Sequence, residues 1–237
     1  MSMPSSATMS PAMAHADGYH RWVFSSFARH VSAGTVLEVG SGHGRYARLL
    51  AGRAARVIVS DIDPRAVESL RSELGGLPNI EYRVMDGVDR KIVGTEVDAI
   101  LLVNVLEHIA DDAAVLRACH ETLRPGGCVA IFVPAFPALY ATMDAEAGHH
   151  RRYRRRELRE KLSAAGFAIE ELRFFNAVGF AGWLANKWLG SKLAGTGTNV
   201  QISLFDKLVP VIRLVDPAIP FLGQSLVAVG RRPGTPC

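Results

Sequence analysis

Cysteine is scarce in this 237-residue chain. Its three cysteines, Cys119, Cys128 and Cys237, have neither the number nor the spacing of a disulfide framework, and no metal site is predicted. The first two lie in apolar stretches, so we expect them to pack as small hydrophobic side chains. So few cysteines fit a reducing compartment, and a cytoplasmic location is expected.

The chain also lacks a segment suited to export or to spanning a membrane. The first dozen residues have no basic start and no apolar core, so residues 1–14 are predicted to be a disordered tail and not a signal peptide. A long uncharged run, residues 125–143, contains three prolines and two glycines, which would break a spanning helix. That run is better explained as a turn, a strand and a loop.

There is no broad excess of charge of either sign. The net charge is +4, and the excess of basic residues is concentrated in residues 151–156. This cluster is short and lacks stacking aromatics beyond Tyr153, so no nucleic-acid partner is expected. With 49% hydrophobic and 21% charged residues, the chain is predicted to form one globular domain over residues 15–237.

The most informative stretch is a buried-strand pattern, residues 36–39, that leads into three glycines at alternate positions. Glycine permits a tight turn and lets a ligand approach the backbone. A second apolar strand ends at Asp61, about 20 residues after Gly40, which is the spacing for a carboxylate that binds a ribose diol. Glu38, two residues before the first glycine, would repel a pyrophosphate at the following helix, so a cationic or amine-bearing ligand is expected instead.

This pattern, Glu-x-Gly-x-Gly-x-Gly with Asp61, resembles the first motif of class I S-adenosylmethionine (SAM) dependent methyltransferases. Leu-x-Pro-Gly-Gly at 123–127 and Val-Leu-Glu-His-Ile at 105–109 resemble the broad bacterial small-molecule group, of type 11 or 12. Residues 133–140, Asp144 and residues 148–153 are similar to one subgroup of it. The resemblance implies a Rossmann-like α/β fold: a seven-stranded, mostly parallel sheet with helices on both faces, a last antiparallel strand and a helical insertion before it.

The same resemblance assigns most of a SAM site. The glycine loop would border the methionine moiety, and Asp61 with its neighbour would bind the ribose. Asp86-Gly87 would bind the adenine amine, and Asn104 would lie near the methionine end. Three residues have alternatives. Tyr19 either packs its helix on the sheet or covers the cofactor, and Asp86 either accepts the adenine amine or caps a turn. His108 packs structurally, lies against the adenine or acts as a base. The predicted cofactor residues are Tyr19, Glu38, Gly40, Ser41, Gly42, Asp61, Ile62, Asp86, Gly87, Asn104, Val105 and His108.

A long loop after the fifth predicted strand, residues 134–153, is where an acceptor would meet the cofactor. We expect His149 or His150 to deprotonate or orient the acceptor and Asp144 to orient the histidine. Arg152 would pair with an acidic substrate group, since a guanidinium holds a carboxylate bidentately. Tyr153 completes the predicted catalytic set, whereas residues 154–156 are expected to be a solvated helix start.

The predicted function is transfer of a methyl group from SAM to an oxygen or nitrogen atom of a small-molecule acceptor, natural-product or lipid-like, leaving S-adenosylhomocysteine (SAH). Alternatives are C-methylation, a non-methylating SAM-assisted reaction and, with less support, an RNA- or membrane-surface-binding module. The apolar insertion at 176–222, with a flexible break at 195–199, is a helical cover, a lid or a membrane-surface element. A homodimer is a further alternative to a monomer.

Overall fold

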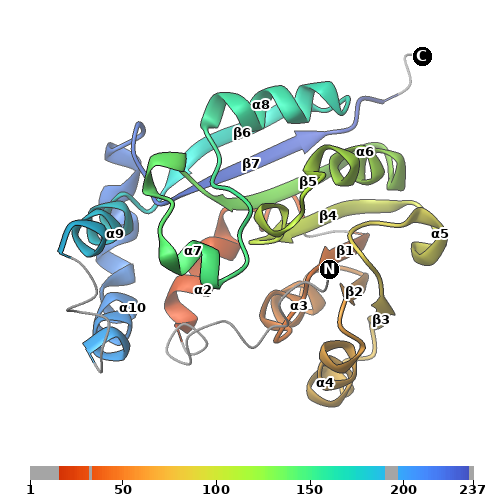
Figure 1. Ribbon diagram of the computed structural model, residues 1–237. Helices are drawn as coiled ribbons and strands as arrows, with labels where there is room; N and C mark the ends of the chain where they lie inside the picture. The colour runs from red at the N-terminus through yellow and green to blue at the C-terminus, as the bar shows by residue number, and fades with distance from the viewer. Residues whose placement is uncertain (1–15, 32–33, 190–196, 235–237) are drawn as a thin grey trace.

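The computed structural model describes residues 16–31, 34–189 and 197–234 (Figure 1). Its centre is one seven-stranded sheet in the order β3-β2-β1-β4-β5-β7-β6. Strands β1 to β5 pair in parallel, and β7 runs antiparallel to both of its neighbours, which confirms the predicted sheet. The strands are β1 (Thr35–Val39), β2 (Arg56–Asp61), β3 (Ile80–Val84), β4 (Val97–Val103), β5 (Leu123–Pro134), β6 (Ala168–Phe175) and β7 (Ser225–Arg231).

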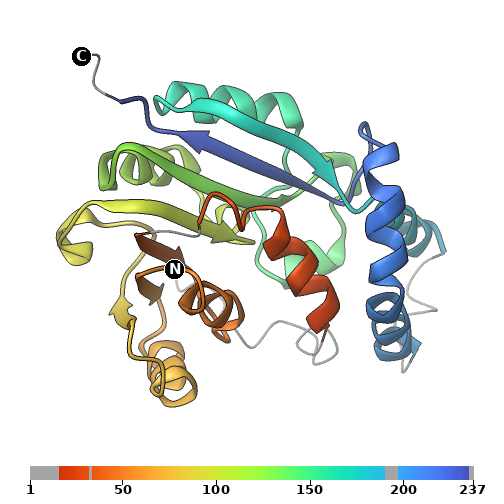
Figure 2. The ribbon, with the colours of Figure 1, turned by 180° about the vertical axis from the view of Figure 1, so that it is seen from behind.

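Helices cover both faces of this sheet, so each central strand is apolar on both sides. On one face pack α5 (Arg90–Val93), α6 (Asp112–Thr122) and α8 (Arg155–Ala164). On the other, which faces the viewer in Figure 2, pack α2 (Asp17–Ser25), α3 (Arg45–Ala51) and α4 (Pro64–Leu74). Cys119 and Cys128 are buried in these two cores, as predicted.

Two helices begin as their sequences predict. The Asp63 side chain accepts a hydrogen bond from the Arg65 N–H and caps α4, with Pro64 at the first helical position. Asp111 caps α6 by accepting from the Ala114 N–H at 2.9 Å. Each cap lies between a strand of the parallel sheet and the helix that follows it. The caps therefore fix where these two helices begin.

The remaining elements lie around the carboxyl ends of the parallel strands. They are η2 (Leu106–His108), η3 (Pro137–Leu139), α7 (Thr142–Glu146), α9 (Ala177–Leu189), α10 (Gly197–Val215) and η5 (Asp216–Ala218). Figures 1 and 2 both place α9 and α10 at one end of the sheet, beside α2. The Asp206 carboxylate on α10 accepts the N–H groups of Gly18 and Tyr19 on α2, which joins the predicted insertion to the domain.

Three local expectations differ from the structure. The apolar spacing of residues 16–31 predicts one helix that runs to about Val31, whereas the observed helix ends at Ser25. The Ser25 hydroxyl donates to the Trp22 carbonyl at 2.6 Å and competes with the helix for that acceptor. The turn expected at 124–127 belongs to β5, which begins early opposite Val97 and has a register shift there, with Gly126 at a φ of +79°.

The third difference concerns the break expected at 195–199. Residues 197–199 form the first turn of α10, and residues 195–196 lie outside the described residues, as does the predicted tail. Within the described ranges, no helix is both long and apolar enough to cross a membrane.

Candidate functional site

The glycine loop after β1 forms the floor of the candidate site. Gly40, Gly42 and Gly44 all have positive φ, a backbone conformation that other residues rarely adopt. A Cβ on Gly40 would lie 2.8 Å from Val105, and one on Gly44 would lie 2.7 Å from Leu70, so these two glycines permit close packing. A Cβ on Gly42 would meet nothing within 4 Å, which leaves its backbone open to a ligand.

Glu38 lies beneath this loop and is 3% exposed. The Ser41 and Ser60 hydroxyls donate to its backbone carbonyl, and Ser41 N–H donates to the Ser60 carbonyl at 2.9 Å, so the loop is tied to β2. Among the described residues, nothing hydrogen-bonds to Glu38 Oε2. Burial, assisted by the negative charge of Asp61 and partly offset by Ser41, raises the pKa of Glu38 to about 8.

Asp61 is aimed at the glycine loop by two backbone groups. Its Oδ2 accepts the Gly42 N–H at 3.2 Å, and its Oδ1 accepts the Asp63 N–H at 3.1 Å. The side chains of Asp61 and Ile62 are half-buried, so part of the carboxylate remains available. Asp86 is exposed after β3, and it precedes Gly87, which is buried with a φ of +66°.

Asn104 ends β4 at the same edge of the sheet. It has a φ of +53°, which few residues other than glycine and asparagine tolerate, and its N–H donates to the Phe132 carbonyl at 2.8 Å. Its side chain is exposed, while the adjacent Val105 is buried against Gly40. Carboxylates and amides from β1, β2 and β4 thus face one region, as expected where parallel strands end.

Tyr19 belongs to an aromatic cluster with Trp22, Phe175 and Phe205. Burial raises the pKa of its hydroxyl, and a hydrogen bond to Ser225 offsets this in part. Since Ser225 begins β7 opposite the end of β5, the Tyr19 hydroxyl lies at the ligand edge of the sheet. The packing interpretation of Tyr19 holds, and a contact with a cofactor stays a prediction.

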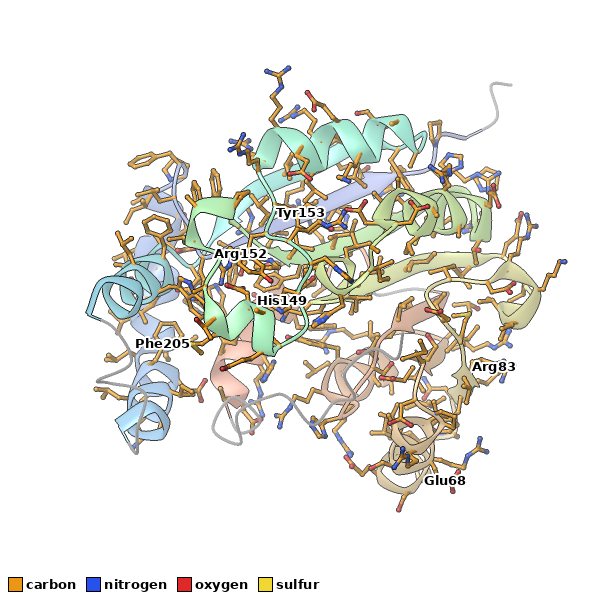
Figure 3. All side chains as sticks on the ribbon, in the orientation of Figure 1. Glu68, Arg83, His149, Arg152, Tyr153 and Phe205 are labelled. Atoms are coloured by element: carbon orange, nitrogen blue, oxygen red, sulfur yellow. The ribbon has the colours of Figure 1, made fainter. Side chains whose placement is uncertain are left out.

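The loop between β5 and α8 folds back on itself through a parallel bridge between Ala135 and Tyr153. Asp144, 1% exposed, binds the Arg152 Nε at 2.9 Å and the His149 Nδ1 at 3.0 Å. Arg152 and His149 are labelled in Figure 3. Burial acts to raise the pKa of Asp144, but the hydrogen bonds from His149 and Arg152 outweigh it and lower that pKa. The guanidinium of Arg152 also lies over the Trp183 ring, 4.5 Å from its centroid.

The structure brings three of the predicted catalytic residues together and separates two others. Asp144, His149 and Arg152 form one network, and Asp144 orients His149 as expected. His150 is exposed, and its N–H donates to the Glu107 carbonyl at 2.7 Å. Arg152 was expected to pair with an acidic group of the substrate. In the structure its guanidinium pairs with the Asp144 carboxylate inside the protein.

Tyr153 points away from this network. It is fully buried, and its hydroxyl donates to Asp112 Oδ2 at 2.8 Å, while the Lys161 ammonium binds Asp112 Oδ1 at 2.7 Å. These contacts join the loop to α6 and α8, so the geometry gives Tyr153 a structural role and does not support one in the reaction. Residues 154–156 are exposed, in agreement with the solvated helix start.

Sequence reasoning missed two residues of this region, Glu107 and Trp183. Glu107 is fully buried in η2, and its neighbour His108 is half-buried with its ring 4.7 Å, centroid to centroid, from that of His149. The indole N–H of Trp183 donates to the Leu139 carbonyl at 3.0 Å, which brings α9 against the loop. A carboxylate inside the apolar run Val-Leu-Glu-His-Ile was the one available signal for Glu107.

These residues fit a SAM-like ligand. A buried carboxylate oxygen without a partner suits an ammonium or sulfonium group, and the open backbone at Gly42 beside Asp61 leaves room for a ribose. Neither feature suits a phosphate, since both carboxylates would repel it.

Comparisons with known proteins agree with this geometry. A family profile described as a methyltransferase domain matches residues 15–172. A probable SAM-dependent methyltransferase of Mycolicibacterium smegmatis is 31% identical over 165 residues, covering 68% of this chain and 63% of that protein. A ubiquinone biosynthesis O-methyltransferase of Cereibacter sphaeroides is 38% identical over 94 residues, 39% of this chain and 38% of that protein.

The chain therefore spans less than two thirds of the length of these curated relatives. Among solved structures, the N-methyltransferase NodS of Bradyrhizobium japonicum in complex with SAH superposes with a TM-score of 0.59 at 16% identity. That match covers 91% of this chain and 88% of the other, and at this identity it establishes a shared fold.

Proposed function

Since the chain belongs to the class I SAM-dependent methyltransferase family, we propose that it transfers a methyl group from SAM to an oxygen or nitrogen atom of a small-molecule acceptor. The observation that carries this proposal is the Glu38 carboxylate, buried and unpartnered at Oε2, beneath the open backbone of Gly42. A cationic ligand would supply the missing partner, and Asp61 lies where it would bind the ribose hydroxyls.

When bound, SAM supplies an activated methyl group: the acceptor atom bonds to the methyl carbon as the carbon–sulfur bond breaks, and the electron pair stays on sulfur to give SAH. The protein's main task is then to hold the acceptor in line with that bond. The acceptor proton must leave as well, and a positioned base helps when the acceptor is a hydroxyl.

The loop between β5 and α8 contains the candidate groups for that task. Asp144 fixes the ring of His149 through Nδ1, which leaves the other ring nitrogen to meet an acceptor or its proton. His150, exposed beside it, is the alternative base. Arg152 is assigned a positioning role, because it binds Asp144 and the Ala135 carbonyl and not a surface-facing group.

Calorimetric titration with SAM and, separately, with SAH tests the cosubstrate site. We expect micromolar binding that falls at least tenfold in Asp61→Ala, because each hydrogen bond to a charged acceptor is worth about 1.5–3 kcal/mol. Asp63→Ala is the matched control: it removes a helix cap two residues away and leaves binding intact. Equal binding by wild type and Asp61→Ala would contradict the assigned site.

The reaction itself is tested with labelled SAM and a panel of hydroxyl and amine acceptors. Appearance of SAH in step with a methylated product supports methyl transfer, and consumption of SAM without methylated product favours a SAM-assisted reaction of another type. An RNA-binding role would appear as retention on RNA that weakens steeply with salt. We expect no such retention.

A further inference from the structure

Three potential metal ligands meet beside the candidate site. Glu107 and His108 lie in η2, directly after β4, and His149 comes from the loop before α8. One ligand atom of each lies within 4.8 Å of those of the other two. The fold creates this cluster, because two segments about 40 residues apart in sequence are brought together at the carboxyl edge of the sheet.

The carboxylate of Glu107 is the unexplained member. It is fully buried, and neither of its oxygens has a hydrogen-bond partner within the described part of the chain. Burying a carboxylate without a partner is costly, so such groups in proteins are paired or coordinate metals.

Both histidines are held in the manner of metal ligands. The Nδ1 of His149 is bound to the Asp144 carboxylate, and the ring of His108 is hydrogen-bonded to the backbone of Gly148. A metal-binding histidine usually donates its second ring N–H to a carboxylate or a backbone carbonyl, which fixes the ring and its tautomer.

We propose that Glu107, His108 and His149 bind one divalent first-row transition-metal ion, with its remaining coordination positions open to water or the acceptor. Two imidazoles and a carboxylate suit Zn²⁺, Fe²⁺ or Mn²⁺ better than the oxygen-seeking Mg²⁺ or Ca²⁺. Shifts of about 1 Å in the side chains would bring the three donor atoms to 2.0–2.2 Å from one ion. Binding of the ion does not depend on the acceptor.

The use of the ion rests on the proposed function. An ion here would bind the acceptor oxygen and lower the pKa of its hydroxyl, as a metal does for bound water, so that the oxygen attacks the methyl carbon as an alkoxide. His149 would then orient the acceptor through the ion, and His150 would be free to accept the proton. The site thus favours an oxygen acceptor over nitrogen.

Metal titration of the full untagged chain, stripped with chelator and free of SAM and acceptor, tests the binding claim. We expect one Zn²⁺ or Co²⁺ per chain by calorimetry, with Co²⁺ giving visible absorption bands. Glu107→Gln and His108→Ala should each weaken binding at least 100-fold. His150→Ala is the matched control, since it alters the adjacent histidine outside the cluster, and should leave metal affinity within twofold.

Circular dichroism and thermal melting of each variant separate loss of the site from loss of the fold. Glu107→Gln keeps the shape of a buried carboxyl group that has no hydrogen-bond partner, so the metal-free variant should melt no lower than wild type while losing the stabilisation that Zn²⁺ gives. Metal binding by Glu107→Gln equal to wild type, or no stoichiometric binding by wild type, would overturn the proposal. SAM titration of the same samples reports independently on the proposed function, so the two can fail separately.

Discussion

Replacing Glu38 by glutamine should stabilise the ligand-free protein above pH 5. The neutral side chain has nearly the same shape, and it removes a carboxyl group whose pKa is raised from 4.5 to about 8. Between these two values the unfolded state ionises Glu38 and the folded state does not. The contribution of Glu38 to the free energy of unfolding of the wild type therefore falls as pH rises from 4.5 to 8 and then stays level. The glutamine variant has no such pH-dependent contribution at this position.

The size of the effect follows from the rise of the Glu38 pKa from 4.5 to about 8. At 1.36 kcal/mol per unit, the full cost is about 5 kcal/mol well above pH 8, about 3 kcal/mol at pH 7 and below about 1 kcal/mol at pH 5. The stability difference between Glu38→Gln and wild type should therefore grow by about 4 kcal/mol from pH 5 to pH 9. In a domain of this size that corresponds to roughly 10 °C in melting temperature.

Urea unfolding of both proteins at pH 5, 7 and 9 measures this difference directly, because the pH dependence of every other group cancels between them. Glu81→Gln is the control: the hydrogen bond from Arg56 lowers the pKa of Glu81 below 4.5, so its stabilising contribution is complete above pH 5 and the difference between this variant and the wild type should stay constant from pH 5 to pH 9. A difference for Glu38→Gln that does not change with pH would refute the assignment of a raised pKa to this group.

The other predictions concern the loops. Asp144→Asn leaves the buried Arg152 guanidinium without a counter-charge and should cost about 3–5 kcal/mol in urea unfolding at pH 7; a cost below 1 kcal/mol would contradict the network. Tyr153→Phe should lower stability by about 1–3 kcal/mol and leave turnover per folded molecule unchanged, and a selective loss of turnover would give Tyr153 a part in the reaction. Gly44→Ala should lower the melting temperature more than Gly42→Ala does, because only its methyl group would meet other side chains. For Gly42→Ala, the loss of SAM binding free energy, measured by calorimetric titration, should exceed the loss in free energy of unfolding.

The central fold and the cofactor edge were predictable because their signals are local. Alternate glycines with Glu38 and Asp61 lie within one strand-loop-strand unit, and the burial of parallel strands on both faces makes them apolar runs. The cap at Asp63 and the helix start at Asp111-Asp112 are equally local, since they depend on a side chain and the backbone N–H groups that directly follow it. These predictions needed no knowledge of what packs against them.

The expected helix end at Val31 was wrong because apolar spacing does not show where a side chain competes for a backbone carbonyl, as Ser25 does. The turn expected at 124–127 lies within β5 as an irregular segment: Leu123 pairs with Val97 and Cys128 with Ala99, whereas residues 124–127 have no partner on β4. In both cases the local pattern was compatible with two structures, and contacts with the rest of the chain selected one.

The sequence by itself determined the sheet and the family, and it predicted a set of cofactor residues, because each of these depends on groups close together in the chain. Only the tertiary structure decided which polar residues meet in the loop between β5 and α8. It turned Tyr153 toward Asp112 and gave Arg152 an internal carboxylate partner. It also brought His149 to Glu107 and His108, a contact between distant segments that spacing along a chain cannot encode.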